Sequence, residues 1–162
     1  MFEYMTVREL YELSIDSFEL EKDNLDYVEL QGWVRTNRNN GSVGFIELND
    51  GTYFKSAQLV YSKDNKDFDE YSKFGTGYAV TVMGRFVLTP ENKQPFEIQV
   101  KEIVLEGDCS EDYPLQKKRH GFEFLREIAH LRPRTNTFSA VFRVRSVLAM
   151  AIHEFFQSQG FV

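Results

Sequence analysis

Aromatic, amide and cationic side chains that could stack on a nucleic-acid base and read its edge are spaced along the first half of the sequence. The period-two alternation of a strand sends Ile46 and Leu48 to one face and Phe45 to the other. The same alternation turns Gln58 away from its apolar neighbours and Arg35 away from the core. An outward Phe beside outward Arg and Gln is typical of a base-stacking platform. From pattern alone, a ring that covers a loop or a neighbouring strand is an equally good interpretation.

Groups that could perform catalysis are sparse in the sequence. The histidines His120, His130 and His153 are scattered, and the run that begins at His153 lacks the second His of a zinc-protease helix. The sequence has no glycine-rich phosphate-binding loop, and its single cysteine, Cys109, rules out an internal disulfide. We therefore expect binding chemistry from this chain, without a metal site or a catalytic centre.

Five strands are needed to position the candidate binding residues. Alternating apolar residues predict them at about 27–38, 43–49, 53–61, 78–89 and 96–105. A short helix is predicted between the third and fourth strands, because three aromatic residues follow one another at intervals of three there. This connectivity predicts a mainly β fold, the five-stranded OB-fold barrel, whose second and third strands commonly bind oligonucleotides. A β-sandwich or an SH3-like barrel would show the same periodicity.

A helix is predicted before the first strand. Thr6 and Glu9 have the spacing of a capping box, in which each residue's side chain satisfies the other's backbone N–H group. The residues Val7, Leu10 and Tyr11 then fall on one side of the helix. We expect this apolar side to pack beside or to plug the sheet.

The sequence changes character after Gly107, where a polar, turn-prone stretch is the predicted domain boundary. A helix at 122–130 is expected to be interrupted by Pro133. From 137 to 159, apolar residues recur at helical spacing and form a stripe that needs a partner. We therefore predict three segments, an OB-fold domain, a hinge and a long helix, at 1–107, 108–136 and 137–162.

Charge is distributed unevenly along the chain, whose net charge is −6. Residues 1–30 hold nine acids against two bases, which gives −7, whereas residues 117–145 hold eight bases against two acids, which gives +6. Such polarity suits a protein that meets a polyanion with one region only, although a basic run is more often a solvated face. The sequence has no membrane-length apolar run and no signal peptide, so we expect a cytoplasmic protein without membrane partners.

Two sets of residues resemble a known family. The first resembles the N-terminal anticodon-binding domain of the aspartate, asparagine and lysine group of class II aminoacyl-tRNA synthetases: Gly32-Trp33-Val34, Arg38, Phe45 to Asp50, and Gln58. The second, residues 113–120 and 123–138, is similar to the bacterial-type asparaginyl-tRNA synthetases. Residues 138–162 resemble the beginning of class II motif 1, and the sequence stops before the characteristic proline of that motif.

The resemblance implies that the intact protein ligates asparagine to tRNA(Asn) with ATP and Mg²⁺. It implies that this piece binds the anticodon, contributes a homodimerisation helix and is inactive alone, because motifs 2 and 3 are missing. Phe45 matches the ring that stacks on the central anticodon uridine, and Gln58 matches the amide that hydrogen-bonds to it. The resemblance also assigns Arg38 to the anticodon, and strict alternation would point this side chain inward unless a bulge or turn lies near Asn37.

The fifth predicted strand carries two further candidates. Glu97 and Gln99 lie where the family contacts the first anticodon base, and with Arg35, Arg38, Phe45 and Gln58 they complete the candidate anticodon-binding set. Two other functions remain open from the residues themselves. One is a free-standing OB-fold protein that binds single-stranded nucleic acid without sequence preference, and the other is a protein-interaction barrel without an RNA role.

Overall fold

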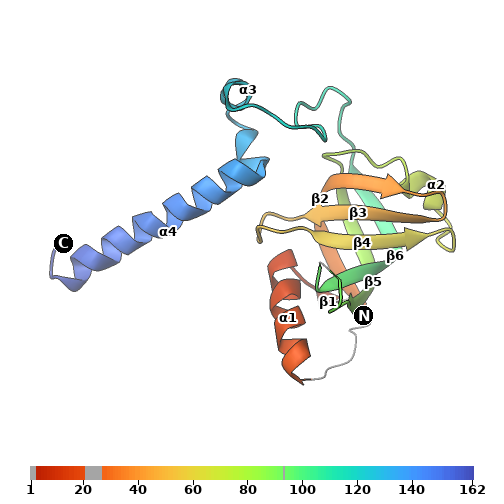
Figure 1. Ribbon diagram of the computed structural model, residues 1–162, viewed down its shortest axis with the longest axis horizontal. Helices are drawn as coiled ribbons and strands as arrows, with labels where there is room; N and C mark the ends of the chain where they lie inside the picture. Colours follow the sequence, from red (N-terminus) through yellow and green to blue (C-terminus); the bar gives the residue numbers. More distant parts are fainter. Residues whose placement is uncertain (1–2, 21–26, 93) are drawn as a thin grey trace. The chain divides into compact units, whose positions relative to one another are not determined.

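The computed structural model describes residues 3–20, 27–92 and 94–162, which fall into two compact units, residues 1–117 and 118–162. Figure 1 shows the secondary structure elements of both units. In chain order they are β1 (Glu3–Tyr4), α1 (Val7–Leu20), β2 (Val28–Asn39), β3 (Val43–Asn49), β4 (Ala57–Ser62), α2 (Phe68–Tyr71), β5 (Ala79–Leu88), β6 (Phe96–Gly107), α3 (Phe122–Glu127), the 3-10 helix η1 (Arg132–Arg134) and α4 (Asn136–Ser158).

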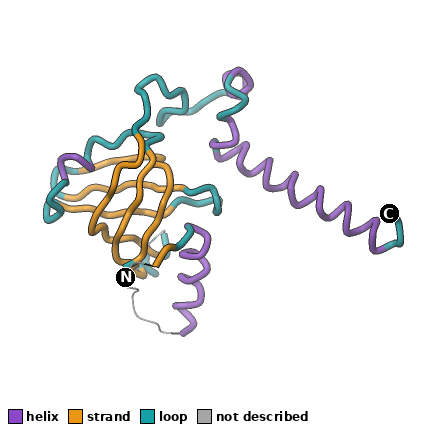
Figure 2. Tube along the Cα trace, turned by 180° about the vertical axis from the view of Figure 1, so that it is seen from behind, coloured by secondary structure: helices purple, strands orange, loops and turns teal. Residues whose placement is uncertain are grey.

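The strands of the first unit close into a barrel. Their order is β1-β2-β3-β4-β6-β5, and β2 pairs with β5 as well as with β3, so that the sheet returns to its own beginning. The two views of the chain in Figures 1 and 2 show these strands wrapping around a common interior. The barrel strands β2 to β6, with α2 between the third and the fourth of them, have the connectivity of an OB-fold, as predicted.

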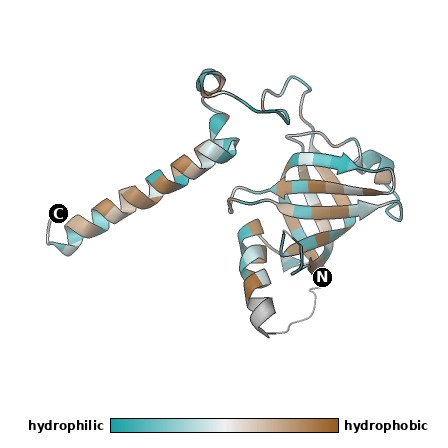
Figure 3. Cartoon of the chain, in the orientation of Figure 1, coloured by the Kyte–Doolittle hydropathy of each residue, from teal (hydrophilic) through white to brown (hydrophobic). Residues whose placement is uncertain are grey.

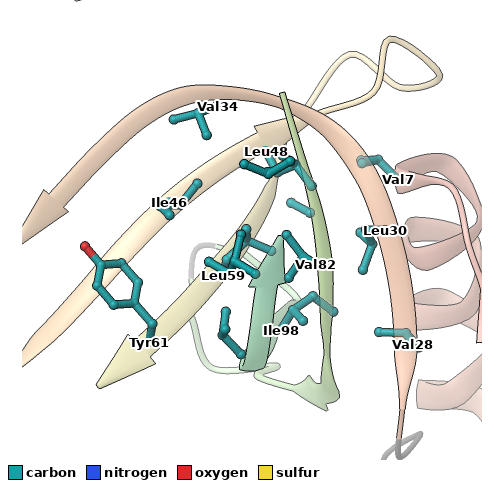
Figure 4. Close-up of a cluster of buried hydrophobic side chains, with 14 of the residues drawn as sticks. Val7, Val28, Leu30, Val34, Ile46, Leu48, Leu59, Tyr61, Val82 and Ile98 are labelled. Carbon is teal, nitrogen blue, oxygen red and sulfur yellow. The ribbon is translucent and has the colours of Figure 1, made fainter. Parts of the chain in front are cut away.

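The interior of the barrel is filled by alternate side chains of its strands. In Figure 4 these side chains point toward one another from five different strands, and each is at most 1% exposed: Val34, Ile46, Leu48, Leu59, Val82 and Ile98. Because successive strand residues face opposite sides, burial of Ile46 and Leu48 places Phe45 and Glu47 on the outer surface. The alternation expected from the sequence is therefore confirmed for β3.

Helix α1 packs against one end of the barrel through Val7, Leu10 and Tyr11, which are buried as predicted. The capping box is present, since the Thr6 N–H donates to Glu9 Oε2 at 2.7 Å and the Glu9 N–H donates to Thr6 Oγ1 at 3.2 Å. The pKa of the Glu9 carboxyl is lowered, chiefly because the Thr6 backbone N–H stabilises the carboxylate and also because the Thr6 hydroxyl donates to Glu9 Oε2 at 2.7 Å.

Three predicted elements are shorter in the structure than the sequence indicates: the third strand, the helix that follows it, and the helix predicted at 122–130, which is α3 and ends at Glu127. The strand expected from residue 53 begins at Ala57, because the Asn49 and Asp50 side chains bond to the backbone of the following residues and form a loop. The helix expected between 63 and 74 is reduced to Phe68–Tyr71, although all three of its aromatic residues are buried. The two-residue strand β1, which pairs in parallel with β2, was not predicted.

The second unit consists of helices. Pro133 lies in η1, between α3 and α4, where the predicted interruption occurs. The Arg132 guanidinium carbon lies 4.9 Å from the centroid of the Phe138 ring, which ties η1 to the first turn of α4. Helix α4 contains no buried residue, and Figure 3 shows apolar positions recurring along its length. Within the described ranges, no helix combines the length and apolarity needed to cross a membrane.

Candidate nucleic-acid interface

A bulge in β2 determines which of its side chains reach the outer surface. Val34 pairs with Leu48, but Thr36 pairs with Glu47, so that the register of β2 against β3 shifts by one residue at Arg35. After this shift, Arg38 lies opposite Phe45 and on the same outer face. The bulge required for an outward Arg38 is therefore present, two residues before the predicted position at Asn37.

The outward Arg38 contacts the candidate stacking ring. Its guanidinium carbon lies 5.3 Å from the centroid of the Phe45 ring, within the range of a cation–π interaction. Arg38 is exposed and Phe45 is half-buried, so that both present atoms to solvent. The guanidinium and the ring can each stack on an unpaired base, and the guanidinium can also pair with a phosphate.

The strand pairings extend this contact into a row across the barrel. Arg38 pairs with Phe45, Phe45 with Val60, Val60 with Gln99, and Gln99 with Arg85. These five residues lie one on each of the five barrel strands, so the row follows the curved outer surface of the barrel. We call these five residues the outer row. It has an arginine at each end, with an aromatic ring, a small apolar residue and an amide between them.

A second row lies beside the outer row. Glu47 pairs with Gln58 across β3 and β4, and the parallel register that joins Leu59 to Ile98 brings Gln58 beside Glu97. Gln58 and Glu97 are half-buried and Glu47 is exposed. Gln58 therefore lies one row from Phe45 on the adjacent strand, where its amide can donate to and accept from the edge of a base stacked on the ring.

The structure thus brings five of the six predicted residues to one face of the barrel, namely Arg38, Phe45, Gln58, Glu97 and Gln99. The sixth, Arg35, is the residue that the register skips, and its carbonyl accepts a hydrogen bond from Thr76 Oγ1 at 3.2 Å. Arg35 is therefore part of the bulge and outside the two rows.

Two members of the outer row, Val60 and Arg85, were not among the predicted site residues. Alternation alone placed Arg85 on the outside of its strand. Only the strand order, with β6 between β4 and β5, reveals that it lies beside Gln99. The missing signal was therefore long-range pairing, which a single sequence does not contain.

The charge of this face is balanced. Arg38 and Arg85 stand at the ends of the outer row, and Glu47 and Glu97 lie in the neighbouring row. A nonspecific single-strand binder needs a continuous basic groove, which these rows do not form. No three His, Cys, Asp or Glu side chains cluster so as to hold a metal ion in the part of the chain that the structure describes.

Comparison with known proteins shows which family the barrel resembles. Residues 28–106 match the tRNA anticodon family, described as an OB-fold nucleic acid binding domain. The chain is 58% identical over 135 residues to the asparagine–tRNA ligase of Desulfitobacterium hafniense, an alignment that covers 83% of this chain and 29% of that protein. It is 56% identical over 160 residues to the asparagine–tRNA ligase of Clostridium acetobutylicum, covering 99% of this chain and 33% of that protein.

A solved structure has a similar fold. Asparaginyl-tRNA synthetase from Pyrococcus horikoshii, complexed with asparaginyl-adenylate, superposes with a TM-score of 0.78 at 27% identity, covering 99% of this chain and 35% of that chain. The chain spans about a third of the length of these relatives. The similarity favours a synthetase domain over a free-standing OB-fold protein. The barrel is therefore an OB-fold domain of the tRNA anticodon family, and the chain belongs with the N-terminal part of the asparaginyl-tRNA synthetases.

Proposed function

We propose that the outer face of the barrel binds the anticodon loop of tRNA(Asn), with Phe45 stacking on the central base and Gln58 hydrogen-bonding to its edge. The observation that carries this proposal is the adjacency of the two residues. Phe45 lies on β3, Gln58 lies one row away on β4, and both face outward from a rigid barrel. Single-stranded loops are read in this way, because their bases can unstack and lie on an aromatic platform while polar groups contact their edges.

The other residues of the face receive supporting roles in this proposal. Gln99 and Glu97 contact the first anticodon base from β6, and Arg38 contacts the loop beside Phe45. Arg85, at the far end of the outer row, contacts a phosphate. Arg35 acts indirectly, through the bulge that it occupies.

The proposed specificity follows from the different tolerances of stacking and hydrogen bonding. A base–aromatic stack is worth about 1 to 3 kcal/mol and accepts any base, because every base has a π face. A wrong base, in contrast, would leave donors or acceptors of Gln58 without hydrogen-bond partners, and unpaired polar groups in an interface reduce the binding free energy. The ring therefore supplies affinity and the amide supplies discrimination.

For the intact protein we propose asparagine–tRNA ligation in the cytoplasm, with ATP and Mg²⁺ held by residues outside this chain. We further propose that α4 mediates homodimerisation. Its large apolar side chains stand exposed along the helix, including Val147 at 69% and Phe155 at 60%.

A binding titration tests the proposed function. The chain is titrated against tRNA(Asn) and against the same tRNA with its central anticodon base exchanged for cytidine, at matched salt, since affinity for RNA depends on salt. We expect the exchanged tRNA to bind at least tenfold more weakly. Equal affinities for the two would indicate nonspecific single-strand binding, and no binding to either would indicate a protein-interaction barrel.

A further inference from the structure

Arg38 and the residue before it, Asn37, face opposite sides of β2. After the bulge, Asn37 pairs with Ile46 and faces inward, so that the next residue, Arg38, faces outward. A shift of one residue in this segment would exchange the two side chains between the core and the surface.

Asn37 makes three hydrogen bonds on the inner side of β2. Its amide nitrogen donates to the Tyr71 carbonyl at 2.8 Å and to the Phe74 carbonyl at 3.1 Å, at the end of α2. Its amide oxygen accepts from the Tyr61 hydroxyl at 2.9 Å, on β4. Both polar ends of the side chain are therefore engaged, by elements 24 to 37 residues away in sequence.

The surroundings of Asn37 reinforce this arrangement. The Tyr61 ring crosses directly over Gly44, where an added Cβ would collide with it. The bulge itself is held by the loop before β5, because the Gly77 N–H donates to the Val34 carbonyl at 2.8 Å and the Val34 N–H donates to the Tyr78 carbonyl at 2.8 Å. The loop thus holds the start of the register shift, and Asn37 holds its continuation.

We propose that Asn37 is the positioning residue of the RNA-binding face, which holds the post-bulge register of β2 and thereby presents Arg38 beside Phe45. This inference rests on the proposed function, since it concerns how the same face is assembled. A carboxamide is suited to this role because it offers two donors and an acceptor, which match two carbonyls and one hydroxyl. A leucine of similar volume would leave those two carbonyls without this donor and would loosen the register.

A double-mutant cycle with Arg38 distinguishes positioning from general stabilisation. Affinity for a stem-loop RNA carrying the asparagine anticodon is measured for Asn37→Leu, Arg38→Ala and the double variant, at a temperature where urea unfolding shows each to be folded. We expect Asn37→Leu to lose most of the affinity lost by Arg38→Ala, and we expect the double variant to bind within twofold of Arg38→Ala. If Asn37→Leu lowers the RNA affinity by the same factor in the unmodified chain and in Arg38→Ala, the positioning role is wrong.

Two further variants keep the inference testable if Asn37→Leu fails to fold. Asn37→Asp retains the acceptor for Tyr61 but lacks the two donors, and we expect it to show the same dependence on Arg38. Val7→Ala, at a buried position on α1, serves as a destabilised control that should keep full affinity. If Phe45→Ala and Arg38→Ala both bind like the unmodified chain, the proposed function fails. If Phe45→Ala alone weakens binding, only the positioning inference fails.

Discussion

At the scale of single residues, we propose that the candidate face separates affinity from discrimination. Phe45 can stack on any base, whereas Gln58 presents a fixed pattern of donor and acceptor one row away. The guanidinium carbon of Arg38 lies over the Phe45 ring, 5.3 Å from its centroid, so that a cation adjoins the proposed stacking surface. Substitutions within this small group should therefore have different consequences.

Replacing Gln58 with Ala should reduce discrimination more than affinity. The stacking ring remains, so we expect uridine and cytidine at the central anticodon position to bind within about threefold of each other, a difference below roughly 1 kcal/mol. The measurement is the ratio of the two dissociation constants for the variant and for the unmodified chain. A ratio unchanged by the substitution would show that Gln58 does not read the base.

Replacing Arg85 with Ala should weaken binding uniformly across anticodon sequences. A phosphate contact carries no sequence information, and its loss should reduce the slope of log affinity against log salt by about one. Titrations at several salt concentrations check this expectation. A variant that instead loses discrimination, with an unchanged slope, would place Arg85 at a base.

The residue scale also shows what could and could not be predicted from the sequence. Alternation in β3 was enough to place Phe45 outside and Ile46 inside, because both facts are local. Arg38 could not be placed in this way, since its direction depends on the bulge between Val34 and Thr36, whose hydrogen bonds join residues far apart in sequence. The family resemblance required a bulge or turn near Asn37, and the bulge lies two residues earlier, at Arg35.

At the scale of elements, the bounds of long periodic segments were predicted well. The bounds of short segments, and of segments next to loops, were not. Strand β3 has the predicted bounds of 43–49, and α4 begins and ends within one residue of its predicted limits. The helix α2 is far shorter than predicted, because turns fixed by Asn65 occupy the residues before it. Strand β1 is only two residues long and exists through its pairing with β2, which no local pattern reveals.

The docking of α1 should make stability depend on pH at the alkaline end. Burial raises the pKa of the Tyr11 phenol to about 12, against an ordinary value of 10.0, while its hydroxyl donates to the Ser56 carbonyl. The stability that depends on the neutral phenol is fully present below pH 10. It is lost as the pH rises toward 12, because the unfolded chain releases its proton first.

Replacing Tyr11 with Phe should therefore reduce the loss of unfolding free energy between pH 10 and pH 12. At pH 8 the variant should be less stable by about 0.5 to 1.5 kcal/mol, because a hydrogen bond is lost, and the difference should shrink as the pH rises above 10. Urea unfolding at pH 8, 10 and 11.5 measures the effect. If the free energy of unfolding changes with pH in the same way for the two proteins, Tyr11 ionises in the folded chain as it does in the unfolded chain.

At the scale of the whole molecule, α4 carries an apolar stripe that needs a partner. Phe142, Leu148 and Phe155 stand exposed on a helix of 23 residues in which no residue is buried. Large exposed apolar patches mark interaction sites, and the chain spans about a third of the length of its relatives. The partner we propose for this stripe is a second copy of the chain.

Sedimentation velocity at increasing concentration should show self-association of the chain. A double substitution, Leu148→Glu with Phe155→Glu, should restore the monomer, because two carboxylates would be buried without partners in the interface. A double variant with glutamates at two exposed positions outside α4, Lys117→Glu with Arg119→Glu, serves as the control and should leave self-association unchanged. A strictly monomeric chain whose α4 amides resist hydrogen exchange would contradict the proposed role of α4.

The most direct test of the central claim is a comparison of Phe45→Ala with Tyr4→Ala, an exposed ring on β1, for stability and for RNA binding. Phe45 faces outward, so its replacement should cost little stability compared with the buried Leu48→Ala, for which about 2 to 5 kcal/mol is expected. We predict that Phe45→Ala binds the anticodon stem-loop about 5- to 150-fold more weakly, as loss of a stack worth about 1 to 3 kcal/mol requires, while Tyr4→Ala binds normally. If Phe45→Ala is as unstable as Leu48→Ala and binds the RNA with unchanged affinity, the ring is structural and the proposed interface is wrong.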